Sequence, residues 1–313
     1  MSTAQQAPEA FARAAAIARP KRRRRPRPGG TWWRHLVAVV AIVFALFPPA
    51  YVLSAAFTSN PALSAASLIP EKPTLENFER LFSAGESTEA SNAAAYGHWY
   101  LNTMIVATVT ALLTVLLGSL AAYAFSRFRF RGRRTGLLFL LLIQMFPALL
   151  LVVAIYLIVL RIGDVFGFIG LNTLSGLIVV YLGGALGVQT WLLKGFFDTI
   201  PHELDESARV DGATPGQIFW GVVIPLAAPV LAVISLLSFI GTINEFVIAS
   251  VILQDTDTFT LPLGMRGYID QQFAQHWGPF AAGVLLAAIP VVLLFMFLQR
   301  FIVRGLTTGA VKG

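Results

Sequence analysis

The chain has 313 residues with a net charge of +7; 56% of the residues are hydrophobic, only 12% are charged, and the mean hydropathy is +0.71. Ordinary soluble domains carry about 25% charged residues, so this composition excludes a typical soluble protein. Cysteine is absent, which excludes disulfides, thiolate metal sites and cysteine nucleophiles.

The N-terminal region, residues 1–35, is rich in proline, arginine and alanine and has no apolar periodicity. We expect a disordered basic tail in the cytoplasm. Its basic run, Lys21–Arg25, has two interpretations. It binds anionic membrane lipid, at about 1 kcal/mol for each charge near the surface, or it serves only to set the topology of the spans that follow.

Long apolar segments make up most of the remaining chain. A hydrocarbon core about 30 Å thick requires about 20 apolar residues of helix, and a helix satisfies its backbone amides within the span. Five runs of this length carry no charge, and a sixth carries only Glu245. In chain order the runs are Leu36–Phe57, Leu101–Phe125, Gly136–Leu160, Thr173–Leu193, Val222–Leu253 and Pro279–Leu298. The sequence therefore predicts an all-α integral membrane protein with six transmembrane helices in a domain covering residues 36–302.

Basic residues are concentrated on one side of this arrangement. Nineteen of the 23 Lys and Arg residues lie before Leu36, between Phe125 and Gly136, between Leu193 and Val222, or after Leu298. Because positively charged loops stay in the cytoplasm, both termini are expected inside. The loop Ser126–Thr135 alternates arginine with phenylalanine, which favours a snorkelling membrane boundary over a nucleic-acid site.

The segment from Leu204 to Pro229 is polar and rich in turn residues, although it lies between two apolar runs. Acidic residues at its start favour a short helix with Leu204 and Ala208 on one face. Gly212 favours the end of that helix, and Thr214, Pro215 and Gln217 predict a capping box on the next one. We therefore expect a short helix, a glycine turn and a second helix, which transmits a push to the fifth span.

This segment resembles the EAA loop of permease subunits in binding-protein-dependent ABC importers. The family pattern of Glu-Ala-Ala, three residues and Gly is matched by Glu206-Ser207-Ala208 and Gly212, with Ile224-Pro225 following; Ser207 and Ile224 depart from the usual Ala and Leu. The resemblance implies a type I ABC importer permease fold, in which this cytoplasmic loop (204–229) seats on an ATP-hydrolysing subunit. The residues it assigns to that contact are Leu204, Glu206, Ser207, Ala208, Asp211, Gly212 and Ala213.

Other segments are similar to carbohydrate importers, and to the maltose class in particular, over Thr74–Gly313. They are NTMIVA at 102–107, LPLGMRGYI at 261–269, WGPFAAG at 277–283 and the C-terminal QRFIVRGLTTGAVKG at 299–313. The resemblance implies a multi-pass protein of the bacterial cytoplasmic (inner) membrane. Its implied partners are a second homologous permease subunit, an ATP-binding subunit dimer and an extracytoplasmic sugar-binding protein.

Two further segments acquire expected roles from the resemblance. The cytoplasmic tail at residues 303–313 is either an extended segment that inserts between the ATPase subunits or a frayed terminus. The outer loop at residues 254–278 is expected to face the binding protein. Within that loop the contact residues expected are Asp257, Leu263, Gly264 and Tyr268.

Polar residues within the spans suggest a passage for solute. Gln144, Asn244 and Glu245 offer the donors and acceptors that sugar hydroxyls need. The alternative is that they form interhelical hydrogen bonds and have no ligand role. The chain has no phosphate-binding GxxxxGK[ST] loop, no metal-ligand spacing and no nucleophile with its base. We expect a sugar permease without cofactor or metal that is not itself an enzyme and borrows ATP hydrolysis from a partner. The alternative is an ion- or proton-coupled secondary transporter with Glu245 as its coupling site.

Overall fold

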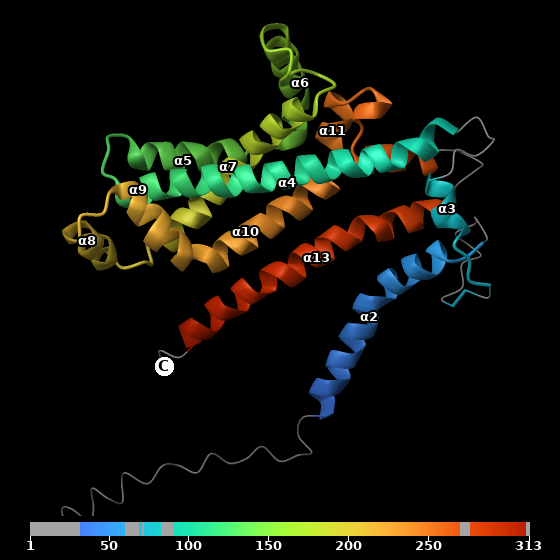
Figure 1. Cartoon of the computed structure of the whole chain (residues 1–313), viewed down its shortest axis with the longest axis horizontal. Coiled ribbons are helices and arrows are strands. Elements are labelled where there is room, and N and C mark those ends of the chain that lie inside the picture. Colours follow the sequence, from blue (N-terminus) through green and yellow to red (C-terminus); the bar gives the residue numbers. More distant parts are fainter. Residues whose placement is uncertain (1–31, 60–68, 71, 83–89, 270–275, 311–313) are drawn as a thin grey trace, which may run out of the picture. The chain divides into compact units, whose positions relative to one another are not determined.

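The computed structural model describes residues 32–59, 69–70, 72–82, 90–269 and 276–310 (Figure 1). The chain divides into two units, Met1–Pro49 and Ala50–Gly313. Most of the predicted basic tail, including Lys21–Arg25, lies outside the described residues. Helix α2 (Trp32–Ala56) is apolar over its whole length and contains Pro48 and Pro49. Its side chains up to Ala50 are exposed, as expected for a span that faces lipid or another subunit.

Four helices pack against one another in the unit Ala50–Gly313 (Figure 1). Helix α4 (Ala90–Arg127) packs along α7 (Leu174–Phe197) and α10 (Ile224–Asn244), and α13 (Trp277–Ala310) packs along α10. Small residues permit the close approach, because Gly118 of α4 lies directly against α7. The short helix α3 (Glu76–Phe82) is attached to the end of α2 through the Asn77 side chain, which donates to two backbone carbonyls.

The predicted third span, Gly136–Leu160, is not one straight helix. It consists of α5 (Arg133–Gln144) and α6 (Ala148–Val165), which are bent by 106°. Pro147 lies at the break, where it lacks an amide donor and disfavours helical geometry in the residue before it. Within the described chain, five helices are long and apolar enough to cross a membrane, and six if α5 and α6 count as one.

The predicted fifth span, Val222–Leu253, is also interrupted. It is entered through α9 (Pro215–Ile218) and the π-helical turn η2 (Phe219–Val223), and α10 then ends at Asn244. A separate short helix, α11 (Val247–Ile252), follows. The side chain of Glu245 causes the break, because it accepts hydrogen bonds from the free amides at the start of α11 instead of projecting from a continuous helix.

The last described segments lead to the C-terminus. Turn η3 (Thr256–Thr258), helix α12 (Leu261–Met265) and turn η4 (Arg266–Tyr268) form the described part of the predicted outer loop. Helix α13 then continues through Ala310, so most of the segment predicted to be an extended or frayed tail is helical. No proline follows Pro290 to end this helix.

Candidate functional site

The polar segment between α7 and α10 forms a sharp elbow, which we define as residues 202–218. Helix α8 (His202–Val210) ends at Asp211, and Gly212 has a φ of 84°, in the left-handed region that glycine adopts without strain. Helix α9 then begins with a complete capping box. The Thr214 hydroxyl accepts from the Gln217 amide at 3.3 Å, and the Gln217 side chain accepts from the Thr214 amide at 2.8 Å. The predicted helix, glycine turn and capped second helix are confirmed.

The elbow presents a continuous outer surface. Five of the seven residues assigned to a coupling contact are exposed, namely Leu204, Glu206, Ser207, Asp211 and Gly212. Ala208 and Ala213 are half-buried, pack against the apolar cluster beneath the elbow, and are joined by a hydrogen bond from the Ala213 amide to the Ala208 carbonyl at 2.9 Å. The seven residues therefore lie together, and Leu204 is more exposed than Ala208, which lies one turn further along the same side of α8.

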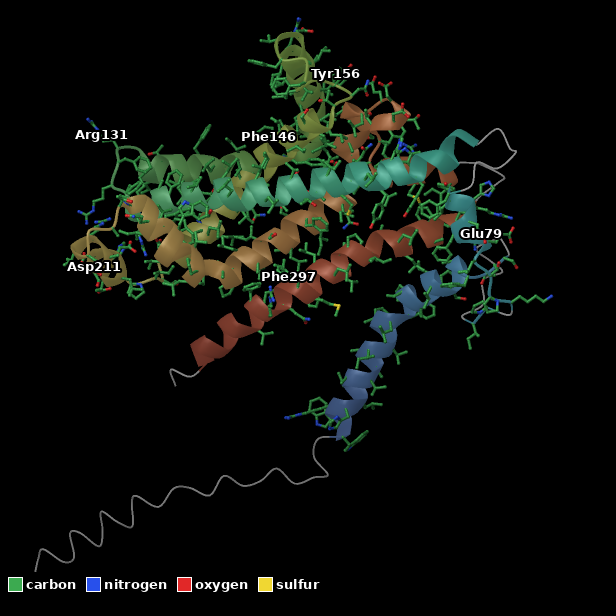
Figure 2. All side chains as sticks on the ribbon, in the orientation of Figure 1. Glu79, Arg131, Phe146, Tyr156, Asp211 and Phe297 are labelled. Carbon is green, nitrogen blue, oxygen red and sulfur yellow. The ribbon has the colours of Figure 1, made fainter. Side chains whose placement is uncertain are left out.

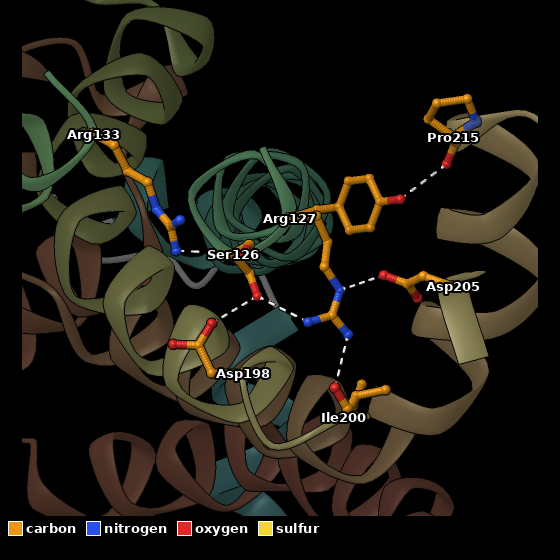
Figure 3. Close-up of polar contacts among 8 residues, drawn as sticks. Ser126, Arg127, Arg133, Asp198, Ile200, Asp205 and Pro215 are labelled. Atoms are coloured by element: carbon orange, nitrogen blue, oxygen red, sulfur yellow. Dashed lines mark hydrogen bonds and ion pairs between the residues drawn. The ribbon is translucent and has the colours of Figure 1, made fainter. Parts of the chain in front are cut away.

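The inner face of α8 carries a carboxylate that sequence reasoning missed. Asp205 is buried and pairs with Arg127, the last residue of α4, with 2.6 Å between Arg127 Nε and Asp205 Oδ2. The two side chains are only 1% and 3% exposed. Arg127 also donates to the Ile200 carbonyl at 3.0 Å (Figure 3). A signal was present in the sequence, because Asp205 is three residues before Ala208 and so shares its helical face.

A second polar contact joins the end of α7 to α4. The Ser126 hydroxyl donates to Asp198 Oδ1 at 2.7 Å (Figure 3). Lys194 pairs with the same carboxylate. Burial opposes ionisation of Asp198, but the hydrogen bonds from Lys194 and Ser126 outweigh it and hold the pKa of the carboxyl below its ordinary value. Asp198 is therefore charged at neutral pH, and the ends of α4 and α7 are held together beside α8.

The elbow shares its end of this unit with the arginine-rich loop. Figure 2 shows Arg131 and Asp211 at one end of the helices and Glu79 at the other. The Tyr123 hydroxyl near the end of α4 donates to the Pro215 carbonyl at 3.3 Å, which attaches α9 to the same helix. The elbow is thus anchored to α4 from both of its short helices.

The three polar residues assigned to a solute passage have separate partners. Gln144 donates to the Gly184 carbonyl of α7 at 2.7 Å. The carboxylate of Glu245 accepts from the amides of Ile248 at 2.8 Å and Ala249 at 3.0 Å, and from the Tyr181 hydroxyl. These contacts match the interhelical alternative for Gln144 and a capping role for Glu245, and the structure does not unite the residues in one site.

Asn244 alone of these three lines a described cavity. Its amide donates to the Ile240 carbonyl of its own helix at 2.8 Å. The cavity has a volume of about 690 Å³, lies between α10, α12 and α13, and is largely apolar, with Asn244 and Arg266 among its lining residues. Phe246, whose ring lies under the Arg266 guanidinium at 5.6 Å, also lines it.

The outer-loop residues assigned to a binding-protein contact are placed differently from one another. Asp257 is exposed, whereas Leu263 and Tyr268 are half-buried and Gly264 is buried. A Cβ atom on Gly264 would lie 2.1 Å from the indole of Trp99 on α4, so this glycine is required for packing. Residues 270–275 of the loop lie outside the described part of the chain.

Several helices long and apolar enough to cross a membrane, with a capped elbow between two of them, fit a permease subunit of a transporter. The family described as the inner membrane component of binding-protein-dependent transport systems matches residues 114–308, and the chain belongs to this family. The predicted resemblance to permease subunits of ABC importers is therefore confirmed, as is a multi-pass membrane protein.

Relatives cover nearly the whole chain. The maltose/maltodextrin transport system permease protein MalG of Vibrio vulnificus is 39% identical over 286 residues, covering 90% of this chain and 96% of the relative. The galactooligosaccharides transport system permease protein GanQ of Bacillus subtilis is 36% identical over 278 residues, covering 89% and 94%. A bacterial ABC transporter that imports the acidic polysaccharide alginate includes a chain with the same fold, at a TM-score of 0.68 and 23% identity, covering 96% of this chain and 99% of that one.

Proposed function

We propose that this chain is the permease subunit of an importer for an oligosaccharide of the maltose or maltodextrin kind, driven by ATP hydrolysis in a partner subunit. The observation that carries the proposal is the 39% identity to a MalG protein over 90% of the chain. Family membership supplies the rest of the assembly: a second permease subunit, an ATP-binding dimer and an extracytoplasmic binding protein. This chain contributes the membrane passage and its mechanical link to the ATPase.

The elbow is the surface that we assign to the ATPase. Helix α8 is short and rigidly anchored, since Asp205 is paired on its inner face while Leu204, Glu206 and Ser207 are exposed on its outer face. Val210, at the end of α8, is 88% exposed and adds an apolar side chain to the surface that we assign to the ATPase. A groove on the ATPase would receive this face, with both termini of the permease on the same cytoplasmic side.

Glu245 takes no part in this proposal as a proton carrier. Its carboxylate accepts two amide hydrogen bonds from the start of α11 and one hydroxyl hydrogen bond from Tyr181. Its position at the break between α10 and α11 favours a structural role over the coupling role that a secondary transporter would need. Among the predicted passage residues, we place Asn244 beside the solute because it lines the cavity.

Cross-linking tests the elbow directly, because the chain has no cysteine and a single introduced thiol is unique. Ser207→Cys places a thiol on the exposed face of α8. With the partner subunits co-expressed in native membranes, a short bifunctional maleimide reagent is expected to link it to the ATP-binding subunit. Arg131→Cys is the matched control, exposed at the same end but outside the elbow.

Uptake distinguishes the importer from the secondary transporter. Vesicles containing the full assembly should accumulate labelled maltodextrin only with ATP and sugar-loaded binding protein. Accumulation by the lone chain under a proton gradient, with no Ser207→Cys cross-link to any ATPase, would reject the proposal.

A further inference from the structure

We infer that α4 and α7 form a strut connecting the elbow to the described outer segment, residues 254–268, so that docking at either end is coupled to docking at the other. The inference rests on the proposed function, which puts an ATPase at the elbow and a binding protein at the outer loop. It adds the route between them and names Asn102 and Arg127 as the positioning residues at its two ends.

Side chains at the outer end of α4 bind backbone groups of the outer segment. The side-chain amide of Asn102 donates to the backbone carbonyls of Asp257 at 2.9 Å and Phe259 at 3.0 Å. One residue further on, the Thr103 hydroxyl accepts from the Leu261 amide at 2.6 Å. Because backbone groups are held, the position of this segment depends on α4 whatever side chains it presents outward.

A packed aromatic contact reinforces these hydrogen bonds. Trp99 of α4 is 2% exposed, and its Nε1 donates to the Thr256 carbonyl at 2.9 Å. Its indole ring lies so close to Gly264 that no larger residue fits there. Close-packed interiors transmit displacement because they have no free volume to absorb it.

The start of α7 holds the same segment. Asn172, immediately before the α7 cap, has a φ of 57°. Its side-chain oxygen accepts from the amides of Gln254 and Asp255, the latter at 3.1 Å, and its own amide donates to the Ile252 carbonyl at 2.9 Å. Both strut helices therefore contact the outer segment at one end.

At the other end the same two helices hold the elbow. Arg127 of α4 pairs with Asp205 of α8 and donates to the carbonyl of Ile200, which follows α7. Asp198, which caps α7, is bonded to Ser126 of α4. The strut thus ends in a buried ion pair, which tolerates little change of geometry.

The helices between these ends are uninterrupted. From Trp99 to Arg127, α4 has 28 residue steps, or about 42 Å at 1.5 Å per residue. Among the spans that the structure describes, α4 and α7 alone contain no proline. Two of the other spans are interrupted, at Pro147 between α5 and α6 and at Glu245 after α10, and α2 and α13 are continuous but contain proline. A push on α8 therefore reaches the outer segment more directly through α4 than through the fifth span.

The test measures coupling in the reconstituted importer: ATP hydrolysis with sugar-loaded binding protein divided by ATP hydrolysis without it. Asn102→Leu removes both hydrogen bonds to the outer segment, far from the elbow, and is expected to lower this ratio at least fivefold. Thr108→Leu, an exposed α4 position outside both contacts, is the matched control and should leave the ratio unchanged.

A double variant tests whether the two ends share one route. Arg127→Met should lower the ratio as well. The double variant Asn102→Leu with Arg127→Met should lower it no further than the stronger single change, because both residues belong to one route and their effects are not additive. Multiplying effects would overturn the inference. If Asn102→Leu prevents assembly, Trp99→Phe replaces it. This change removes the Thr256 hydrogen bond and part of the indole packing against Gly264, with an expected loss of about twofold.

The two proposals fail differently. A wild-type assembly whose ATPase is not stimulated by any sugar-loaded binding protein contradicts the proposed function. A normally stimulated wild type, with Asn102→Leu and Trp99→Phe assemblies stimulated equally, overturns the strut alone.

Discussion

Replacing Asp205 by leucine is expected to release α8 from the end of α4. The substitution leaves the Arg127 guanidinium, whose side chain is 1% exposed, without its counter-charge. Breaking a buried pair by removing one partner costs about 3–5 kcal/mol. Arg127 keeps its hydrogen bond to the Ile200 carbonyl, so the lower value of about 3 kcal/mol applies. Because α8 has only nine residues, the cost should appear as local opening of the elbow.

Amide hydrogen exchange measures that opening in the purified importer. The Ala213 amide, bonded to the Ala208 carbonyl at 2.9 Å, should exchange on the order of 100-fold faster in Asp205→Leu, since each 1.4 kcal/mol is a factor of ten. Amides in the middle of α7 serve as the internal control and should not change.

The companion variant separates charge from packing. Arg127→Met with Asp205→Leu replaces the pair by apolar groups of similar volume, and such replacements are often neutral or stabilising. Exchange at Ala213 should therefore return to within about tenfold of the wild-type rate. If Asp205→Leu alone exchanges at the wild-type rate, the buried pair does not hold the elbow and the reasoning is refuted.

Three further predictions concern single positions. Gly264→Ala should lower the free energy of unfolding by about 1–3 kcal/mol, because the new methyl group meets the Trp99 ring. The control Gly241→Ala, whose methyl group enters open space, should leave that free energy unchanged. Thermal unfolding scans of the importer measure both variants. Gly212→Ala should cost about 1–2 kcal/mol through its φ of 84° alone, seen as faster exchange at the elbow. Because folding lowers the pKa of Asp198, its contribution to stability is complete above the pKa of the unfolded chain and is lost as pH falls through the pKa of the folded chain. The α4–α7 junction should therefore loosen only in acid. Asp198→Asn should abolish this pH dependence of amide exchange.

Regular features of the fold could be predicted because they depend on local composition. Apolar length predicted the spans, and the elbow followed from Gly212 and the Thr214–Gln217 capping box, whose chemistry is complete within a few residues. The interruptions were harder. A proline such as Pro147 is typical of a kinked span, but its presence does not predict a bend of 106°. Glu245 ends α10 through hydrogen bonds to the next helix that no apolar count reveals.

The candidate site divides in the same way. The outer face of α8 was predictable from its motif, whereas the Arg127–Asp205 pair joins residues 78 positions apart and depends on how α4 and α8 meet. From the sequence, Arg127 is one of several arginines at a predicted membrane boundary, and Asp205 is an acidic residue near the start of a predicted helix. Their burial is a tertiary property, and each residue type is seldom buried without a partner.

The buried pair also gives a physical reason to expect that the elbow transmits force to α4, as proposed, instead of absorbing it. An apolar contact between α8 and α4 would permit sliding, because hydrophobic burial has no direction. An ion pair 2.6 Å long, with both side chains almost fully buried, loses several kcal/mol when its partners separate. Together with the Tyr123 hydrogen bond to Pro215, it leaves α8 and α9 one low-energy position relative to α4. A displacement imposed on the exposed face of α8 must therefore move α4 as well, and the outer segment bonded to Asn102 moves with it.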